Sequence, residues 1–357
     1  MYGMSGKMSV EKILFGKTRD GQEVYSYRIE NKNKMAIEVM TFGAILKNVY
    51  VPNAKGKIDD VVLGYDKLWM YFKNGSCFGA TVGPIANRTD KAQFTLGKTT
   101  YQLPVNDRGN NLHTDGDNGF HKRIWNAVVD EKKNSVAFSL VKKDGEMGHP
   151  GTLKVTVTYT LTDKNEIKIQ YHADTNKKTV INMTDHSYFN LSGIKSSNIE
   201  HTKLTIGASN FTPVRKDAIP TGEIAPVKGT PMDFTKEKKI GKDIGKKEYA
   251  QLKICGGYDH NYVVDGYNGK IKKIATAVDD KAGRTLEVYT DLPGVQFYAG
   301  NFIGSNIGKG GYKNGKRKGF CLETQYYPNS ANEKNFPQPI FDSKNPYDTT
   351  TVYKFIW

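Results

Sequence analysis

Two ionisable side chains stand in segments of the chain that otherwise have the pattern of β-strands. His186 lies in TDHSYFNLSG (184–193), and Glu323 lies in GFCLETQ (319–325). An unpaired charge is costly to bury, so a strand needs no such residue in order to fold. Imidazole and carboxylate are groups that exchange protons with substrates near neutral pH. The pattern fits an acid–base site, and it fits equally a salt-bridged structural glutamate and an ordinary strand histidine.

Strand alternation predicts where the neighbours of these two residues point. One face of the first segment is expected to be polar, either exposed or lining a groove, and it would carry Asn182, Thr184, His186, Tyr188 and Asn190. Asp185 points the other way and is expected to be structural. In the second segment, Cys321, Glu323 and Gln325 share a face.

Four further segments mix hydrogen-bonding side chains with aromatic ones: GPIANRTDKAQF (83–94), NNLHTDGDNGFHKRIW (110–125), GYDHNYVVD (257–265) and GVQFYAGNF (294–302). A polyhydroxylated ring is bound by this combination of polar donors and acceptors with apolar surface. The polar candidates in these segments are Asn87, Arg88, His113, Asp259 and Gln296.

The elements that position these residues are expected to be strands, because apolar and polar residues alternate along much of the chain. TLKVTVTYTL (152–161), IKIQYHAD (167–174) and the segment from Thr179 predict an antiparallel meander with short connections. Shorter runs predict strands at 23–30, 34–42, 45–52, 135–143, 260–265 and 285–290. No stretch of a dozen residues has helical periodicity, and no linker divides the chain. We expect an all-β protein, a large antiparallel β-sandwich forming one domain over residues 1–357.

The chain has 357 residues and a net charge of +15, from 52 Lys and Arg against 37 Asp and Glu. The two densest basic runs, 236–247 and 309–319, contain glycines and are interpreted as solvated loops. Without a nucleic-acid motif, this charge predicts a lysine-rich surface and no nucleic-acid partner. Three well-separated cysteines give no disulfide framework. No segment is apolar enough for a membrane span or a leader, which predicts a cytoplasmic protein.

Motifs for phosphate, nucleotide and metal binding are not satisfied. GKT at 16–18 and 97–99 lacks the glycine of a phosphate loop, and no GxGxxG or GxSxG motif is present. HTDGDNGF (113–120) fails as a calcium loop because Gly119 and Phe120 fall at the wrong positions. The seven histidines show no HxH or HExxH spacing. We therefore expect no metal site.

The ordered blocks of this sequence resemble those of the aldose 1-epimerase (galactose mutarotase) family. The blocks are ANR (86–88), NNLH…GFHKRIW (110–125), DHSYFNLSG (185–193), GYDHNYVVD (257–265), PGVQFYAGNF (293–302) and GFCLETQYYPNSANEKNFP (319–337). They cover most of the chain between residues 83 and 337 in the family's order.

The resemblance implies a β-supersandwich with a concave sugar site and no cofactor. It implies that Glu323 is the general base that takes the C1 hydroxyl proton, and that His186 is the general acid at the ring oxygen. By the same resemblance, His113 binds sugar near the ring oxygen. The resemblance also implies hydroxyl-binding roles for Asn87, Arg88, Tyr188, Asp259 and Gln296. The implied partner is a free monosaccharide, and the protein is expected to be a monomer or a weak homodimer.

Three positions depart from the family's pattern. Pro84 stands where the family often has Arg, Thr114 and Asp115 replace a common Gly-Gly, and Asp185 replaces a common Asn. These changes concern substrate preference and loop shape. Other functions considered are a non-catalytic sugar-binding module, a glycosidase pairing Asp259 with Glu323, and a hexose-6-phosphate mutarotase.

Overall fold

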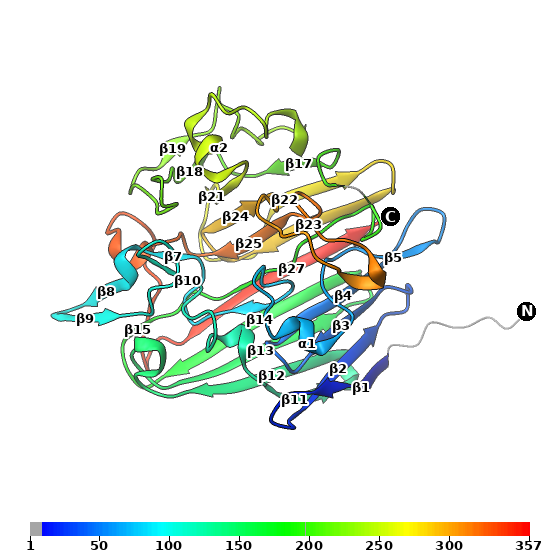
Figure 1. Cartoon of the computed structure of the whole chain (residues 1–357), viewed down its shortest axis with the longest axis horizontal. Helices are drawn as coiled ribbons and strands as arrows, with labels where there is room; N and C mark the ends of the chain where they lie inside the picture. The colour runs from blue at the N-terminus through cyan, green and yellow to red at the C-terminus, as the bar shows by residue number, and fades with distance from the viewer. Residues whose placement is uncertain (1–8, 197) are drawn as a thin grey trace, which may run out of the picture.

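The computed structural model describes residues 9–196 and 198–357, and its largest element is an antiparallel sheet of nine strands. In spatial order the strands are β11 (Asn126–Asp130), β12 (Ser135–Lys142), β13 (Leu153–Leu161), β14 (Glu166–Thr175), β27 (Tyr347–Ile356), β23 (Arg284–Thr290), β22 (Lys272–Asp279), β17 (Lys203–Ile206) and β20 (Lys238–Lys239). The last strand in sequence, β27, thus lies in the middle of this sheet, between β14 and β23 (Figure 1).

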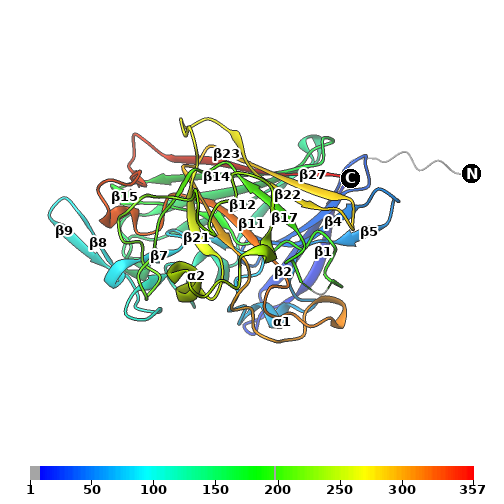
Figure 2. The same cartoon turned by 90° about the horizontal axis from the view of Figure 1, so that it is seen from above.

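Two five-stranded sheets form the other layer. The first contains β1 (Ser9–Lys17), β2 (Glu23–Glu30), β3 (Ala36–Met40), β4 (Ile45–Pro52) and β5 (Ile58–Asp60). The second contains, in spatial order, β19 (Ala225–Pro226), β18 (Asn210–Phe211), β21 (Asp259–Val263), β24 (Gly294–Tyr298) and β25 (Cys321–Gln325). Seen from above, β14, β23 and β27 lie on one side of the molecule, and β1, β2 and β21 lie on the other (Figure 2).

The remaining elements are short. Four two-stranded pairs are β6 (Thr81–Val82) with β16 (Thr184–Asp185), β7 (Arg88–Thr89) with β10 (Asn111–Leu112), β8 (Gln93–Leu96) with β9 (Thr99–Gln102), and β15 (Thr179–Val180) with β26 (Ile340–Phe341). The α-helices of the described residues are α1 (Leu68–Tyr71) and α2 (Ala250–Cys255). Neither of them is long and apolar enough to cross a membrane.

The layers meet in one large hydrophobic cluster, accompanied by two smaller ones, because strand alternation turns every second side chain inward. Along β13, the residues from Leu153 to Leu161 alternate between buried and more exposed positions. Tyr27 of the first five-stranded sheet packs edge-on against Phe138 of the large sheet, with ring centroids 6.1 Å apart. This packing confirms the all-β sandwich predicted from the sequence.

The prediction of a three-stranded meander is wrong for its third strand. β13 and β14 pair as predicted, but β14 then pairs with β27 rather than with the segment that follows it. The chain after Thr179 instead forms only the short strands β15 and β16, and residues 179–191 are all buried. Alternation is therefore not a guide to exposure in this segment, because both of its faces are covered.

One of the basic runs is not a fully solvated loop, as the sequence had suggested. Lys309 is 5 % exposed, and its Nζ donates to Asp60 Oδ2 at 2.7 Å and to the Val62 carbonyl at 2.9 Å. A buried lysine needs such a partner because desolvation otherwise opposes its charge. Lys309 thus ties the loop before β25 to the end of β5.

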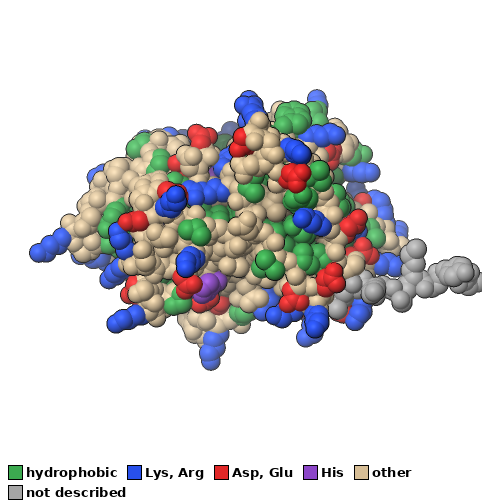
Figure 3. Space-filling model, turned by 90° about the horizontal axis from the view of Figure 1, so that it is seen from below, with side chains coloured by type: hydrophobic (Ala, Val, Ile, Leu, Met, Phe, Trp, Pro, Cys, Tyr) green, Lys and Arg blue, Asp and Glu red, His purple; other side chains and the backbone are tan. Residues whose placement is uncertain are grey.

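Charged side chains are dispersed on the face of the molecule that Figure 3 shows. On the face shown in Figure 3, Lys and Arg side chains alternate with Asp and Glu around a region of apolar and uncharged surface. Residues 1–8, which belong to the N-terminal segment interpreted as lacking a leader, lie outside the described residues.

Candidate active site

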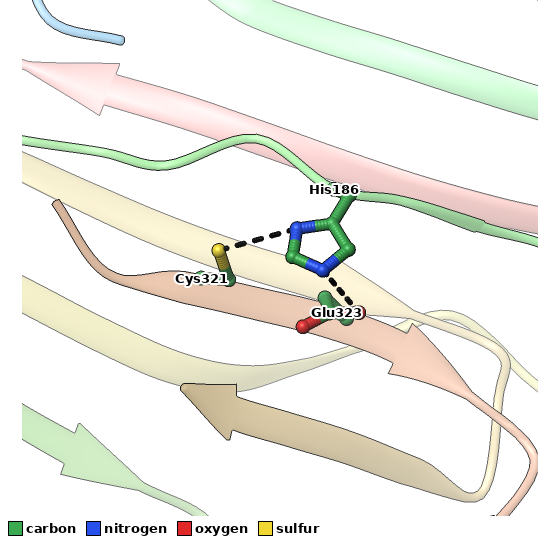
Figure 4. A group of neighbouring side chains, drawn as sticks. All are labelled: His186, Cys321 and Glu323. Atoms are coloured by element: carbon green, nitrogen blue, oxygen red, sulfur yellow. Dashed lines mark hydrogen bonds and ion pairs between the residues drawn. The ribbon is translucent and has the colours of Figure 1, made fainter. Parts of the chain in front are cut away.

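Glu323 and Cys321 project from the same face of β25, as the alternation predicts (Figure 4). β25 is hydrogen-bonded to β24, where Gln296 is the residue opposite Glu323. The intervening residue, Leu322, belongs to the hydrophobic core. The strand therefore presents a carboxylate on one side while its other side is anchored in the sandwich.

His186 faces this strand from a segment that is held by backbone hydrogen bonds. Its N–H donates to the Ala80 carbonyl at 2.9 Å, and its carbonyl accepts from the Gly79 N–H at 3.0 Å. The ring stacks on Tyr188, with centroids 5.0 Å apart and planes inclined by 22°. These three contacts hold the imidazole in front of β25, so the ring is preorganised.

The imidazole lies between the two β25 side chains (Figure 4). Its Nε2 is 3.6 Å from Glu323 Oε2, and its Nδ1 is 3.6 Å from Cys321 Sγ. His186 is 6 % exposed and Glu323 is 2 % exposed. An acid and a base thus stand on adjacent sides of one small space, as proton transfer to and from a bound molecule requires.

Burial shifts the pKa values of this pair in opposite directions. Desolvation raises the pKa of Glu323 well above its usual value, and the negative charges of Asp259 and Asp185 raise it further. Desolvation lowers the pKa of His186 to about 4. Between the lowered pKa of His186 and the raised pKa of Glu323, the pair holds one proton, which either residue can carry. The ionised pair and the neutral pair therefore differ only in which residue carries this proton.

A cavity of about 210 Å³ adjoins the pair. Its size suits one small ligand. The side chains and backbone that line it are Gly75, Ser76, Cys77, Asn87, Arg88, Leu112, His113, His186, Tyr188, Asp259, Tyr298, Phe302 and Glu323.

One wall of the cavity carries charged groups. Arg88 Nε donates to Asp107 Oδ2 at 2.7 Å, which orients the guanidinium. Asp259 Oδ1 accepts from Gln296 Nε2 at 2.7 Å. Burial raises the pKa of Asp259, and Arg88 and Gln296 oppose that shift. Gln296 does not line the cavity itself, so it acts through Asp259.

Asn87 and His113 contact each other at the cavity. His113 Nδ1 accepts from the Asn87 N–H at 3.0 Å, and burial lowers the pKa of His113 well below its usual value. Because Nδ1 is an acceptor, the single proton of the neutral ring sits on Nε2, which becomes a donor. The His113 and His186 rings meet edge-on, with centroids 5.4 Å apart.

The structure brings together seven of the eight residues predicted from the sequence and places Gln296 directly behind them. Three other residues of the predicted polar face around His186 do not line the cavity. Asn182 donates to the Tyr326 carbonyl and Asn190 to the Lys318 carbonyl, and Thr184 is fully buried. These three residues stabilise the fold.

The sequence analysis missed several lining residues. Tyr298 and Phe302 lie in the segment 294–302, where only Gln296 was selected, so their aromatic character was the available signal. Gly75, Ser76, Cys77 and Leu112 carry no pattern that separates them from ordinary loop and strand residues.

Comparison with known proteins identifies the family. The Aldose 1-epimerase family model matches residues 25–354. The chain belongs to this family. Galactose mutarotase of Mus musculus is 41 % identical over 350 residues, which cover 98 % of this chain and 99 % of the mouse protein. Aldose 1-epimerase of Escherichia coli is 34 % identical over 343 residues, which cover 94 % and 96 %.

A solved structure agrees with this aldose 1-epimerase assignment. The galactose 1-epimerase from Lactobacillus acidophilus superimposes with a TM-score of 0.84 and 28 % identity, covering 98 % of this chain and 99 % of that one. The fold is therefore that of the galactose mutarotase-like proteins.

Thr114, one of the departures from the aldose 1-epimerase pattern, occupies a backbone conformation that favours glycine. Its φ is +66°, and His113 before it has φ of +57°. A β-branched residue in this region is strained, so other contacts must hold it. The Thr114 hydroxyl donates to the Ile85 carbonyl and accepts from the Ile85 N–H, both at 2.9 Å. The substitution is thus compensated locally, behind the cavity.

Asp185 is buried beside the site and is only partly hydrogen-bonded. It is 1 % exposed, and Oδ1 accepts from the Ser187 N–H at 3.1 Å. Oδ2 has no hydrogen-bond partner among the described residues. Burial raises the pKa of Asp185 to about 7, although the hydrogen bond from Ser187 opposes the shift.

We expect Asp185→Asn to stabilise the folded protein above neutral pH. A carboxyl group whose pKa is higher in the folded state than in the unfolded state lowers the free energy of unfolding as the pH rises. This loss develops between the unfolded pKa, about 4, and the folded pKa, about 7. The neutral amide removes this loss, which amounts to about 4 kcal/mol at most. Urea unfolding measured at about pH 5 and about pH 8.5 should show a gain for the variant mainly at the higher pH. A variant that is less stable than the parent at both values would contradict this interpretation.

Proposed function

We propose that this protein is an aldose 1-epimerase that interconverts the α and β anomers of free aldohexoses such as galactose and glucose. The observation that carries the proposal is the contact between His186 Nε2 and Glu323 Oε2, 3.6 Å apart at a polar cavity that fits one sugar ring. Family membership and the names of the mouse and E. coli relatives support it.

The reaction needs one proton removed from the sugar and one supplied to it. Glu323, in its ionised form, takes the proton of the C1 hydroxyl. As the C1–O5 bond breaks, His186 gives its proton to O5, and the open-chain aldehyde forms. Rotation about C1–C2 turns the other face of the aldehyde to O5. Ring closure then reverses the two proton transfers, so the pair ends with the single proton with which it began.

The other polar residues of the cavity are proposed to hold the sugar. Arg88 and His113 are donors, the latter through Nε2–H, while Asp259 accepts from hydroxyl groups. Asn87 and Tyr188 complete the polar wall, and Gln296 orients Asp259. His113 is close enough to His186 to hydrogen-bond near the ring oxygen.

Polarimetry of freshly dissolved α-D-galactose and α-D-glucose tests the proposal. The optical rotation should approach equilibrium faster than in buffer, in proportion to enzyme concentration. A rate equal to the buffer blank would reject it and would favour a non-catalytic sugar-binding module. Including galactose 6-phosphate and glucose 6-phosphate in the panel separates a free-sugar enzyme from a hexose-phosphate enzyme.

We further propose that the chain acts as one domain, as a cytoplasmic monomer or weak homodimer without a nucleic-acid partner. The large sheet combines strands from residues 126–175 with strands from residues 203–356, which supports the single domain. All three cysteines are unpaired and buried, which suits a reducing compartment. Sedimentation equilibrium would test the oligomeric state.

A further inference from the structure

Three potential metal ligands from distant parts of the sequence converge beside the cavity. His186, Cys321 and Glu323 each offer one donor atom, and these atoms lie within 4.8 Å of one another (Figure 4). Among the described residues this is the one group of three such side chains. Spacing motifs could not reveal it, because the histidine is more than 130 residues away from Cys321 along the chain.

The thiol and the imidazole are already separated as in a zinc site. Tetrahedral zinc with a bond to sulfur of about 2.3 Å and a bond to nitrogen of about 2.0 Å places the two donor atoms about 3.6 Å apart. Cys321 Sγ and His186 Nδ1 are 3.6 Å apart. A cation can therefore bridge them without moving either residue.

The carboxylate supplies the third donor. Glu323 Oε2 is buried, faces the histidine, and has no hydrogen-bond partner among the residues that the structure describes. This oxygen lies 3.6 Å from Nε2, whereas the thiol lies beside Nδ1, so the carboxylate must move towards Cys321 Sγ to share one ion with Nδ1. The cavity beside it leaves a fourth position for water or a sugar hydroxyl.

The local charge also favours a divalent cation. A thiolate and a carboxylate together neutralise two positive charges, so the occupied site would carry no net charge in a buried environment. Asp259 and Asp185 add negative charge near Glu323, and Arg88, which opposes them, is paired with Asp107.

We propose that a thiophilic divalent cation, Zn²⁺ in the first instance, binds to Cys321, His186 and Glu323 and inhibits the enzyme. This inference rests on the proposed function, since the bound ion would occupy the acid and the base at once. The ion replaces the thiol proton of Cys321 and the proton shared by the other two residues, and both protons pass to solvent. Inhibition should therefore strengthen as pH rises.

The decisive variant is Cys321→Ser, because a neutral hydroxyl is a poor zinc ligand of nearly the same shape. Cys255→Ser is the matched control, since Cys255 is also buried and lies 3.7 Å from a histidine, His260, and neither residue lines the cavity. Each protein's mutarotation rate is normalised to its own rate without zinc. The zinc concentration for half-inhibition should rise by at least about tenfold in Cys321→Ser and stay unchanged in Cys255→Ser.

Cobalt(II) gives a second measurement that does not depend on activity. The parent and Cys255→Ser should show a thiolate-to-cobalt charge-transfer band that Cys321→Ser lacks, and galactose should compete with the metal. If cobalt binds in this way but no mutarotation is seen, the proposed function fails and the metal site stands. A parent protein without the band, or a Cys321→Ser variant as sensitive to zinc as the parent, overturns the metal site.

Discussion

Glu323→Gln is expected to lower the enzymatic rate of anomer interconversion by about 10²–10⁴-fold, the usual contribution of a positioned acid–base group. The amide is nearly the same shape as the carboxylate but cannot accept a proton from the C1 hydroxyl. Cavity shape and sugar contacts should be preserved, so kcat is expected to fall much more than KM rises. Polarimetry with α-D-galactose at several enzyme concentrations measures the effect.

Stability distinguishes loss of catalysis from loss of the fold. Glu323 Oε2 has no hydrogen-bond partner among the described residues, so replacing this buried carboxylate by a neutral amide should not lower the unfolding temperature. Glu287→Gln is the matched control, because Glu287 lies on β23 and pairs with Lys273 at 3.0 Å, outside the cavity. A Glu323→Gln enzyme with near-parental kcat would remove the general base from the mechanism.

The pH dependence of the parent follows from the same pair. Activity requires the one-proton state, so kcat/KM should fall on the acid side as a second proton binds, near the His186 pKa of about 4. It should fall on the alkaline side as the last proton leaves, at the raised pKa of Glu323. The expected profile is a wide plateau between these two limits.

His186→Asn is expected to reduce the rate by a similar factor, about 10²–10⁴-fold. Asparagine can hydrogen-bond to the ring oxygen but has no proton to transfer, so ring opening would have to expel an unprotonated O5. The partly exposed His172, which lies on β14 and pairs with Asp348 of β27 outside the cavity, provides the control variant His172→Asn. Polarimetry of both variants at equal concentration gives the comparison.

The two active-site substitutions should not be additive. If the residues share one proton, the double variant should be little slower than either single variant, because either loss already breaks the cycle. Multiplied effects in the double variant would instead indicate two independent contributions and would contradict the shared-proton mechanism.

Alternation along single strands was enough to predict the elements that carry the site. It identified β13 and β14, and it placed Cys321 and Glu323 on one face of β25. These features depend on the period of a strand, which is visible in the sequence. The pairing of strands is not visible in the same way, because β14 pairs with β27, which lies far from it in the sequence.

The candidate site was predictable where residue chemistry was distinctive. The ordered blocks and the family resemblance they carry led to His186, Glu323 and the polar wall, whereas Cys77 and Leu112 reach the cavity only through tertiary packing. The buried state of Asn182 and Asn190 was hidden as well. A polar residue bonded to a distant backbone carbonyl has the same local pattern as an exposed one.

The central position of β27 has a consequence for how the protein is made. Its neighbours β14 and β23 are joined only through this strand, and the pairing of Glu166 with Lys354 spans more than half of the chain. Such non-local contacts give a high contact order and slow folding. A nascent chain would hold two unjoined half-sheets with exposed edges until residues 347–356 leave the ribosome. The large sheet is thus completed only when β27 becomes available, and the open edges of its two halves are prone to misassembly until then.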